Sequence, residues 1–574
     1  MLKFQDKEVT ISRLKEMSYD ELNSLCALLR EEILSVVSKN GGHLSSNLGV
    51  VELIVALVRF FDFPHDKLFI DVGHQSYTYK LLTGRDLSTL RKKGGISGFQ
   101  KRNESIYDVF EAGHSSTSLS GAIGYAVARD LKKENYDVVA LIGDSSIMNG
   151  LSLEALNDIG RRKNKVIIIL NDNDMSVSKT VGAIHHVASA PEFYKNFGLN
   201  YIGEIDGHNI LDIENALKEA RNSDKSVIVH VITEKGKGYS YAQYDRLGIY
   251  HGISPFKVST GRPSSTADSI SYSSYFAKLV ESSIKNDDKC VVINPAMVLG
   301  SSMQAMFMKY PDRCFDVGIA EEHAITFASG LALNGLKPII SIYSTFLQRG
   351  FDELSHDIAR MKLPALFLID RCGLVGEDGE THQGLYDEAF ILNTPNMILC
   401  VPSDLSTSKA LYENGINYNG PYAIRYPRGN YYNDDKEYEL HLKIGKWLKL
   451  TTSKNNKIAL ITYGKFINEY KKEIVNNNLD VSLYNALYLN PFDEEMLLDI
   501  INHDNIIILN TMASSNGFNN KLISRLNELN YKGNIISKAV KNEFIEQGTI
   551  EEQLMDNGID KKSILSIINS LLSK

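Results

Sequence analysis

Two oxygen-bearing side chains stand just after apolar runs of the sequence. Residues 138–142 (VVALI) are followed by Gly143 and Asp144, and residues 166–170 (VIIIL) lead to Asn173. Short apolar runs of this kind are typical of buried parallel strands, and the residues between them have helical spacing. Ligands of open α/β sheets bind at the carboxyl ends of the strands. The pattern therefore predicts a strand–helix–strand unit with a ligand site at Asp144 and Asn173.

Three loops earlier in the chain each carry a histidine beside glycine or serine. They are His43, His74 and His114, and each stands at the edge of an expected helix or strand. A single loop histidine is more often structural than catalytic, but three in one context make the two interpretations equally good. Glycine loops and helix starts expose backbone N–H groups that bind phosphate. Asp144 and Asn173 offer oxygen ligands that suit Mg²⁺, which takes its other ligands from phosphate and water.

Strands and helices alternate along nearly the whole chain, which predicts an α/β protein with doubly wound, mostly parallel sheets. Residues 257–272 are rich in Ser, Thr, Gly and Pro and have the composition of a linker, and residues 431–439 form a polar run. We therefore expect three domains, over residues 1–260, 273–432 and 440–574.

The composition excludes several function classes. The 574 residues carry a formal charge of −8, which gives no basic surface for nucleic acid. The five cysteines include no C-x-x-C pair, so neither a disulfide framework nor a zinc site is expected. The amino terminus is charged, and no apolar run reaches the length of about 18 residues that a membrane span needs. We expect an unprocessed cytoplasmic protein that binds neither nucleic acid nor membranes.

A set of longer motifs identifies a family. The segments GGHLSSNLGVVEL, DVGHQSYTYKLLTGR, EAGHSSTSLSGAIG, YIGEIDGHN, VGIAEEHAITFASGLA, IYSTFLQRGFDEL and GLVGEDGETHQG follow one another in this order. Together with the G-D-x(28)-N spacing of Asp144 and Asn173, typical of thiamine diphosphate enzymes, they resemble the 1-deoxy-D-xylulose-5-phosphate synthase family. A related transketolase shares the cofactor signature but not GHSSTS or YSTFLQR. The resemblance covers most of residues 18–560 and is weakest in the last domain.

The resemblance implies thiamine diphosphate and Mg²⁺ as cofactors, bound in a transketolase-like fold. Glu321 is then the acid that activates the aminopyrimidine ring, while its neighbour Glu322 points about 100° away along a helix. Phe346 packs on the aminopyrimidine. The implied Mg²⁺ ligands are Asp144, Asn173 and the Met175 carbonyl, and the other implied cofactor contacts are His74, Gly113, His114, Ser115, Ser145, Ser146, Asn173 and Tyr239.

The resemblance also implies the reaction, in which pyruvate loses CO2 and is joined to D-glyceraldehyde 3-phosphate by a homodimeric enzyme. The residues implied to bind substrates are Tyr343, Arg371 and Arg425 for the phosphate, Arg349 for a carboxylate or the acceptor, and His43, His251, Asp378 and His382 for protons and hydroxyls. Two alternatives stay open: another transketolase-like transferase with a different donor or acceptor, and a catalytically inactive binding paralogue.

Three features depart from the family. Ser145 stands in place of the second glycine of G-D-G, where a side chain restricts the approach of the diphosphate. Thr78 and Tyr79 replace a usual Pro-His pair. The connection from Ser178 to Tyr201 is several tens of residues shorter than in the family. Because such segments commonly shelter an active site, we expect wider acceptor tolerance or more unproductive decarboxylation of pyruvate.

Overall fold

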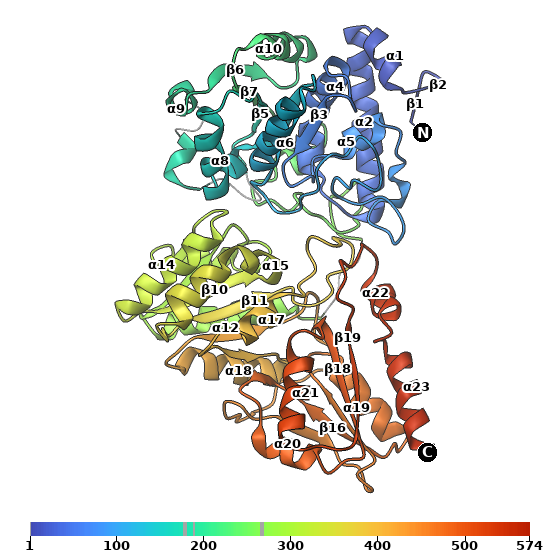
Figure 1. Ribbon diagram of the computed structural model, residues 1–574, viewed down its shortest axis with the longest axis vertical. Coiled ribbons are helices and arrows are strands. Elements are labelled where there is room, and N and C mark those ends of the chain that lie inside the picture. Colours follow the sequence, from blue (N-terminus) through green and yellow to red (C-terminus); the bar gives the residue numbers. More distant parts are fainter. Residues whose placement is uncertain (1, 176–180, 187–189, 265–268, 574) are drawn as a thin grey trace. The chain divides into compact units, whose positions relative to one another are not determined.

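The computed structural model describes residues 2–175, 181–186, 190–264 and 269–573 (Figure 1). The chain divides into two compact units, which are described separately. The first unit comprises Met1–Thr266 with Gly318–Ala320, and the second comprises Ala267–Val317 with Glu321–Lys574.

The first unit contains a five-stranded sheet with all strands parallel, in the order β3-β4-β5-β7-β6. Side chains of β4 alternate between its faces, so that Val139 and Leu141 belong to one core and Ala140 and Ile142 to another. Helices α2, α4 and α10 cover the first face, and α6 and α8 cover the second (Figure 1). The bounds are β3 Lys67–Ile70, β4 Val138–Gly143, β5 Ile167–Asp172, β6 Asn200–Asp206, β7 Val227–Ile232, α2 Tyr19–Asn40, α4 Val51–Phe60, α5 Tyr77–Leu82, α6 Ser118–Lys132, α8 Gly150–Gly160 and α10 Ile210–Asn222.

The second unit contains two sheets. One has the order β17-β12-β13-β11-β10-β8-β9, and its strands are parallel except for the edge strand β17, which runs antiparallel to β12. Its helices include α14 (Glu321–Leu333), α15 (Ser344–Leu347) and α17 (Asp387–Leu392). The strand bounds are β8 Cys290–Asn294, β9 Cys314–Asp316, β10 Lys337–Tyr343, β11 Leu366–Asp370, β12 Ile398–Cys400, β13 Tyr422–Arg425 and β17 Tyr488–Asn490.

The other sheet of this unit has the order β14-β16-β15-β18-β19, with β14 antiparallel to β16 and the remaining pairs parallel. One hydrophobic core runs through both sheets and includes Tyr422, Tyr463, Tyr484 and Phe518. This shared core explains why the two sheets form a single compact unit. The bounds are β14 Leu448–Thr451, β15 Ile458–Thr462, β16 Val481–Asn485, β18 Asn505–Ser514, β19 Asn534–Val540, α19 Ile467–Asn476, α20 Glu494–Ile500, α21 Phe518–Glu528, α22 Ile550–Asp556 and α23 Lys561–Leu572.

The predicted strand–helix–strand unit is confirmed, since Asp144 directly follows β4 and Asn173 directly follows β5. The amino-terminal region begins with a short antiparallel hairpin, in which Lys3–Phe4 pairs with Lys7–Glu8. The three predicted domain ranges stay predictions. In the described part of the chain, no helix combines the length and apolarity needed to cross a bilayer.

Candidate active site

Three histidine rings gather at one place in the first unit. The ring centroids of His43 and His74 lie 5.3 Å apart, those of His43 and His251 5.6 Å, and those of His74 and His251 5.4 Å. Phe99 packs edge-on against His43 at 5.4 Å. Two predicted catalytic residues and one predicted cofactor residue are thus brought together from three separate loops.

Backbone contacts of two loops explain this gathering. The buried Asn47 side chain donates from Nδ2 to the carbonyls of His43 and His74, each at 2.7 Å. Gly42 and Ile253 exchange backbone hydrogen bonds, which holds the His251 segment against the His43 loop. Gly42 has φ +143, and a Cβ there would lie 2.8 Å from the Tyr77 hydroxyl, so glycine is required at this point.

The electrostatic environment keeps His251 neutral. Burial lowers its pKa well below the ordinary value of 6.5, and Lys235, His74 and His43 lower it further. Burial also lowers the pKa of Lys235 to about 8, while the nearby Asp144 opposes that change. Sequence reasoning missed Lys235, although it stands in the segment TEKGKGY, directly before the first of its two glycines. A cation in a glycine-rich segment was the available signal.

Asp144 and Asn173 meet as predicted. The backbone N–H groups of Ser145 and Asn173 donate to the Asp144 carboxylate at 2.6 and 3.3 Å. Burial and the neighbouring Asp172 raise the pKa of Asp144 to about 6, and these donors together with Lys235 oppose the rise. The Asn173 Oδ1 atom is buried and has no hydrogen-bond partner in the described ranges. An oxygen pair of this kind fits a bound cation.

The predicted cofactor loop around Gly113 is hydrogen-bonded to the segments that follow strands β3 and β4. Asp71, which follows β3, accepts hydrogen bonds from the backbone N–H groups of Ser116 and Ser118. The Ser116 hydroxyl donates to the Ser146 carbonyl at 2.9 Å. These bonds fix the end of the 113–118 segment, which contains His114 and Ser115, against the segment that begins at Asp144.

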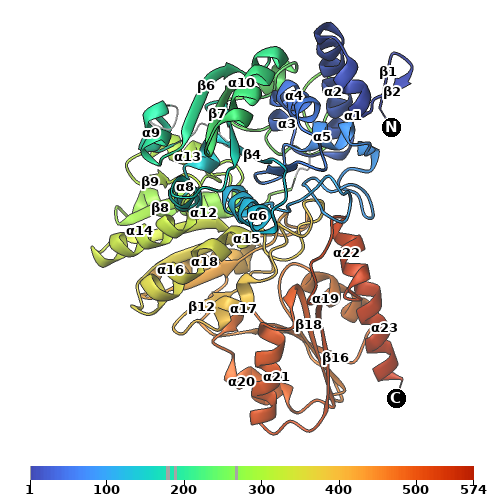
Figure 2. The ribbon, with the colours of Figure 1, turned by 45° about the horizontal axis from the view of Figure 1, so that its top comes forward.

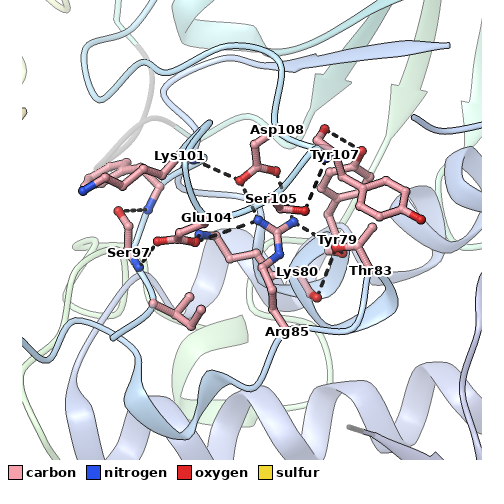
Figure 3. Close-up of polar contacts among 12 residues, drawn as sticks. Tyr79, Lys80, Thr83, Arg85, Ser97, Lys101, Glu104, Ser105, Tyr107 and Asp108 are labelled. Carbon is pink, nitrogen blue, oxygen red and sulfur yellow. Dashed lines mark hydrogen bonds and ion pairs between the residues drawn. The ribbon is translucent and has the colours of Figure 1, made fainter. Parts of the chain in front are cut away.

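An ion-pair clamp holds the long loop that presents Phe99 (Figure 3). The fully buried Lys80 donates to Glu104 at 2.6 Å, and Arg85 forms a two-pronged pair with Asp108 at 2.5 and 3.1 Å. The same carboxylates accept the backbone N–H groups that flank Phe99, from Ser97 to Glu104 and from Lys101 to Asp108, as the sticks of Figure 3 show.

Tyr79 and Ser145, two of the residues that depart from the family pattern, both have a clear structural setting. Tyr79 donates from its hydroxyl to the Tyr107 carbonyl at 3.0 Å, so it helps to anchor the clamped loop (Figure 3). The φ angle of Ser145 is not positive, so a side chain at this position causes no backbone strain. Met175 directly precedes residues 176–180, which lie outside the described part.

Tyr239 belongs to the same segment as Lys235. Its hydroxyl donates to the Val258 carbonyl at 2.8 Å, and its ring packs against Tyr241, Tyr250 and Phe256. Its predicted cofactor contact stays a prediction.

Glu321 opens helix α14 of the second unit, and its side chain is only 5% exposed. Burial raises its pKa to about 7, against the attraction of Arg349, whose Nη1 lies 4.0 Å from Oε2. Oε2 has no hydrogen-bond partner among the residues that are described. The predicted role, activation of the aminopyrimidine ring, requires a carboxyl that exchanges a proton near neutral pH. A pKa of about 7 is compatible with this role, which stays a prediction.

Several predicted substrate residues surround the turn after β10. The rings of Tyr343 and Phe346 stack with centroids 5.4 Å apart, and the guanidinium of Arg371 lies 3.8 Å over the Tyr343 ring. His382 packs edge-on against Phe346 at 5.9 Å and pairs through Nδ1 with the Thr381 hydroxyl. Burial lowers the pKa of Arg371 to about 9, and the nearby Arg428 contributes to this.

The prediction that Arg425 binds the substrate phosphate is wrong. Arg425 is fully buried and donates to the carboxylates of Asp387 and Glu388, so its guanidinium is already occupied. Arg428, three residues later in the segment RYPRGN, is partly exposed and lies 3.4 Å from Asp378. The sequence prediction chose Arg425 rather than Arg428, because residue spacing alone does not show which of the two side chains is buried.

The sequence matches the family model described as 1-deoxy-D-xylulose-5-phosphate synthase over residues 6–190 and 185–233. It also matches the model described as Transketolase, pyrimidine binding domain, over residues 268–433. A curated protein of Clostridium tetani named 1-deoxy-D-xylulose-5-phosphate synthase is 40% identical over 629 aligned positions, which span 100% of both chains. This chain belongs to the 1-deoxy-D-xylulose-5-phosphate synthase family.

Two further proteins are similar to this chain. A 1-deoxy-D-xylulose-5-phosphate synthase of Listeria monocytogenes is 40% identical and covers 100% of this chain and 97% of its own. A solved transketolase of Campylobacter jejuni is 17% identical, with a TM-score of 0.46 over 96% of this chain and 100% of the other. The predicted family, fold class and synthase activity are confirmed, and family membership implies dependence on thiamine diphosphate. The comparisons give no support to the two alternatives.

The comparisons also bear on the short connection. The Clostridium tetani alignment has 629 positions and this chain 574 residues, so about 55 positions have no counterpart here. The match to the synthase family model is split at residues 185–190. Both findings agree with a shortened connection after Ser178, of which residues 178–180 and 187–189 lie outside the described part.

Proposed function

We propose that this protein condenses pyruvate with D-glyceraldehyde 3-phosphate, releasing CO2 and forming 1-deoxy-D-xylulose 5-phosphate, with thiamine diphosphate and Mg²⁺ as cofactors. Glu321 carries the proposal. Its pKa, raised by burial to about 7, allows it to exchange a proton with a heterocyclic nitrogen near neutral pH. Its unpartnered Oε2 leaves an acceptor for that nitrogen.

Each unit, considered by itself, offers groups that suit the cofactors. When bound, thiamine diphosphate supplies the electron sink for the loss of CO2 from pyruvate. The proposed Mg²⁺ ligands are Asp144, the buried Asn173 amide oxygen and the Met175 carbonyl; the proposed diphosphate contacts are His74, Gly113, His114, Ser115, Ser145, Ser146 and Lys235; and Phe346 packs on the pyrimidine. No three His, Cys, Asp or Glu side chains of the described residues form a metal cluster.

The imidazoles of the first unit move protons. His251, which burial holds neutral, can accept a proton at one ring nitrogen. His43 lies against it, and the two rings approach edge to face. We assign these two residues to proton transfer on the hydroxyl and carbonyl oxygens of acceptor and product.

The cations of the second unit hold the acceptor. Arg371 and Arg428 offer planar donors that match the geometry of a phosphate. Tyr343 has a buried hydroxyl without a partner in the part of the chain that is described, so it is available to the same group. Asp378 and His382 orient the hydroxyls of the acceptor, and Arg349 meets the carboxylate of pyruvate or the acceptor.

The test uses purified protein, which we propose to be a homodimer, with pyruvate and D-glyceraldehyde 3-phosphate. Formation of 1-deoxy-D-xylulose 5-phosphate, identified by NMR, should require both thiamine diphosphate and Mg²⁺. Consumption of a ketose phosphate in place of pyruvate would favour another transferase. Cofactor binding without turnover of any donor would favour an inactive paralogue.

A further inference from the structure

A buried network of charged and hydroxyl groups crosses the second unit. At its centre Arg425, at the end of β13, donates from Nε to Asp387 at 2.6 Å and from Nη1 to Glu388 at 2.8 Å. All three side chains are fully buried. Buried charges of this kind need every partner in place, and removal of one leaves the others uncompensated.

One end of the network reaches the substrate residues. The Ser344 hydroxyl donates to Asp387 Oδ1 at 2.8 Å. Ser344 begins α15, so it stands directly after Tyr343 and two positions before Phe346. Arg425 also donates from Nη2 to the Gly384 carbonyl at 3.2 Å, two residues after His382.

The close packing of Gly384 makes this end rigid. A Cβ at Gly384 would lie 2.2 Å from the Arg371 carbonyl and 2.8 Å from the Ser344 hydroxyl oxygen. Gly384 and Gly373 exchange backbone hydrogen bonds at 2.6 and 2.8 Å. The segments that carry Arg371, His382 and Tyr343 therefore meet at one glycine.

The other end of the network lies in the carboxy-terminal sheet. Glu388 accepts hydrogen bonds from the Tyr463 hydroxyl at 2.5 Å, from Asn510 Nδ2 at 3.0 Å and from the Phe518 backbone N–H at 2.9 Å. Figure 2 shows α17, which carries both carboxylates, beside β18 and α21. The path from Tyr463 to Ser344 is thus continuous through Glu388, Arg425 and Asp387.

We propose that Arg425 is a positioning residue, and that Ser344, Asp387, Arg425, Glu388 and Tyr463 form a relay through which the carboxy-terminal sheet fixes Tyr343 and the adjacent phosphate-binding arginine Arg371. This inference rests on the proposed function, which assigns these residues to D-glyceraldehyde 3-phosphate. Each link is a hydrogen bond of the structure, and α17 is the shared element. Small errors in placing binding groups have large effects on bound geometry.

The test compares two buried serines three residues apart. The Ser341 hydroxyl has no hydrogen-bond partner in the described ranges, whereas the Ser344 hydroxyl donates to Asp387. In protein supplied with thiamine diphosphate and Mg²⁺, Ser344→Ala should weaken the binding of D-glyceraldehyde 3-phosphate, measured by calorimetry, by about 10-fold. Ser341→Ala should bind it as the wild type does. Equal affinities of the two variants would overturn the relay.

The far end has its own matched pair. Tyr463→Phe removes a hydroxyl bonded to Glu388, and Tyr484→Phe removes one bonded to Asp499 at 2.6 Å outside the relay. We expect Tyr463→Phe to weaken binding about 3-fold and Tyr484→Phe to leave it unchanged. Because the relay acts as a unit, the Ser344→Ala, Tyr463→Phe double variant should lose about 10-fold, and a multiplicative loss of about 30-fold would reject it.

Two further readouts separate the relay from general damage and from the proposed function. Thermal midpoints of both serine variants should agree within about 2 °C, since Asp387 keeps Arg425 as its partner. Turnover of pyruvate with D-glyceraldehyde 3-phosphate is measured in parallel on the wild type. Absence of product would reject the proposed function, whereas the binding comparison judges the relay without any turnover.

Discussion

Asp144 of the first unit and Glu321 of the second are both buried carboxyls, and their surroundings within their own units differ. Asp144 accepts two backbone N–H groups and lies near Lys235, so donors and a cation favour its anion. Glu321 has Arg349 at 4.0 Å, and its Oε2 lacks a hydrogen-bond partner among the described residues. Burial raises the pKa of Asp144 to about 6 and that of Glu321 to about 7.

This contrast teaches how one physical effect serves two purposes. Desolvation disfavours both anions. Two backbone donors and Lys235 oppose it at Asp144, Arg349 and a backbone N–H group oppose it at Glu321, and the resulting pKa values are about 6 and about 7. An ionised carboxylate is what a Mg²⁺ site needs, and a carboxyl poised near neutrality is what proton exchange needs. The predictions below test whether the two groups differ in this way.

The largest effect should come from Glu321→Gln, which keeps the shape of the side chain and replaces its ionisable carboxyl with a neutral amide. We expect kcat for product formation to fall about 10³-fold, the range of a lost general acid or base. Binding of thiamine diphosphate should change little. Glu322→Gln, one residue along the same helix, is the control and should stay within about twofold of the wild type. Equal losses in the two variants would remove the distinction between these glutamates.

Asp144→Asn should weaken cofactor binding, which Glu321→Gln is expected to leave nearly unchanged. We expect calorimetric binding of thiamine diphosphate in the presence of Mg²⁺ to weaken about 100-fold, because a neutral amide replaces the anion that holds the cation. Chelation of Mg²⁺ with EDTA should weaken wild-type binding to a similar degree and add little to the variant. Normal cofactor binding by Asp144→Asn would contradict the metal assignment.

A third effect separates the two arginines of RYPRGN. Arg428→Met should raise KM for D-glyceraldehyde 3-phosphate by about 10- to 100-fold, the magnitude of a lost charge-assisted hydrogen bond to phosphate. With unphosphorylated D-glyceraldehyde the variant and the wild type should be alike. The exposed Arg360→Met serves as a control for loss of a positive charge. If both acceptors were affected equally, Arg428 would not be a phosphate ligand.

The sequence predicted the first unit's site better than the second's. Asp144 and Asn173 could be placed because their positions at strand ends follow from apolar runs, which are local patterns. The burial of Arg425 could not be predicted, because it depends on ion pairs with Asp387 and Glu388, which belong to a distant segment of the sequence. Charge and hydroxyl partners set by tertiary packing leave no periodic signal.

A smaller effect concerns stability and its dependence on pH. Because the folded protein holds the Glu321 proton more tightly than the unfolded chain, the associated stability is fully present below about pH 4.5 and is lost as pH rises through about 7. In the cofactor-free protein the loss amounts to about 3 kcal/mol at most. Glu321→Gln should therefore raise the thermal midpoint by a few degrees at pH 8 and hardly at pH 5. A shift of equal size at both pH values would mean that the carboxyl is not buried as described.

The smallest effect tests the shortened connection after Ser178, which belongs to the first unit and follows Asn173 in the sequence. A segment that shelters the site limits the loss of the activated donor to solvent. We expect the ratio of CO2 released to 1-deoxy-D-xylulose 5-phosphate formed in the presence of acceptor to be about 2- to 3-fold higher than in a full-length relative such as the Clostridium tetani enzyme. The rate of CO2 release without acceptor should be higher to a similar degree. Restoring the relative's connection should lower that ratio. The same partition in both enzymes would show that the missing residues have no influence on how tightly decarboxylation is coupled to the acceptor.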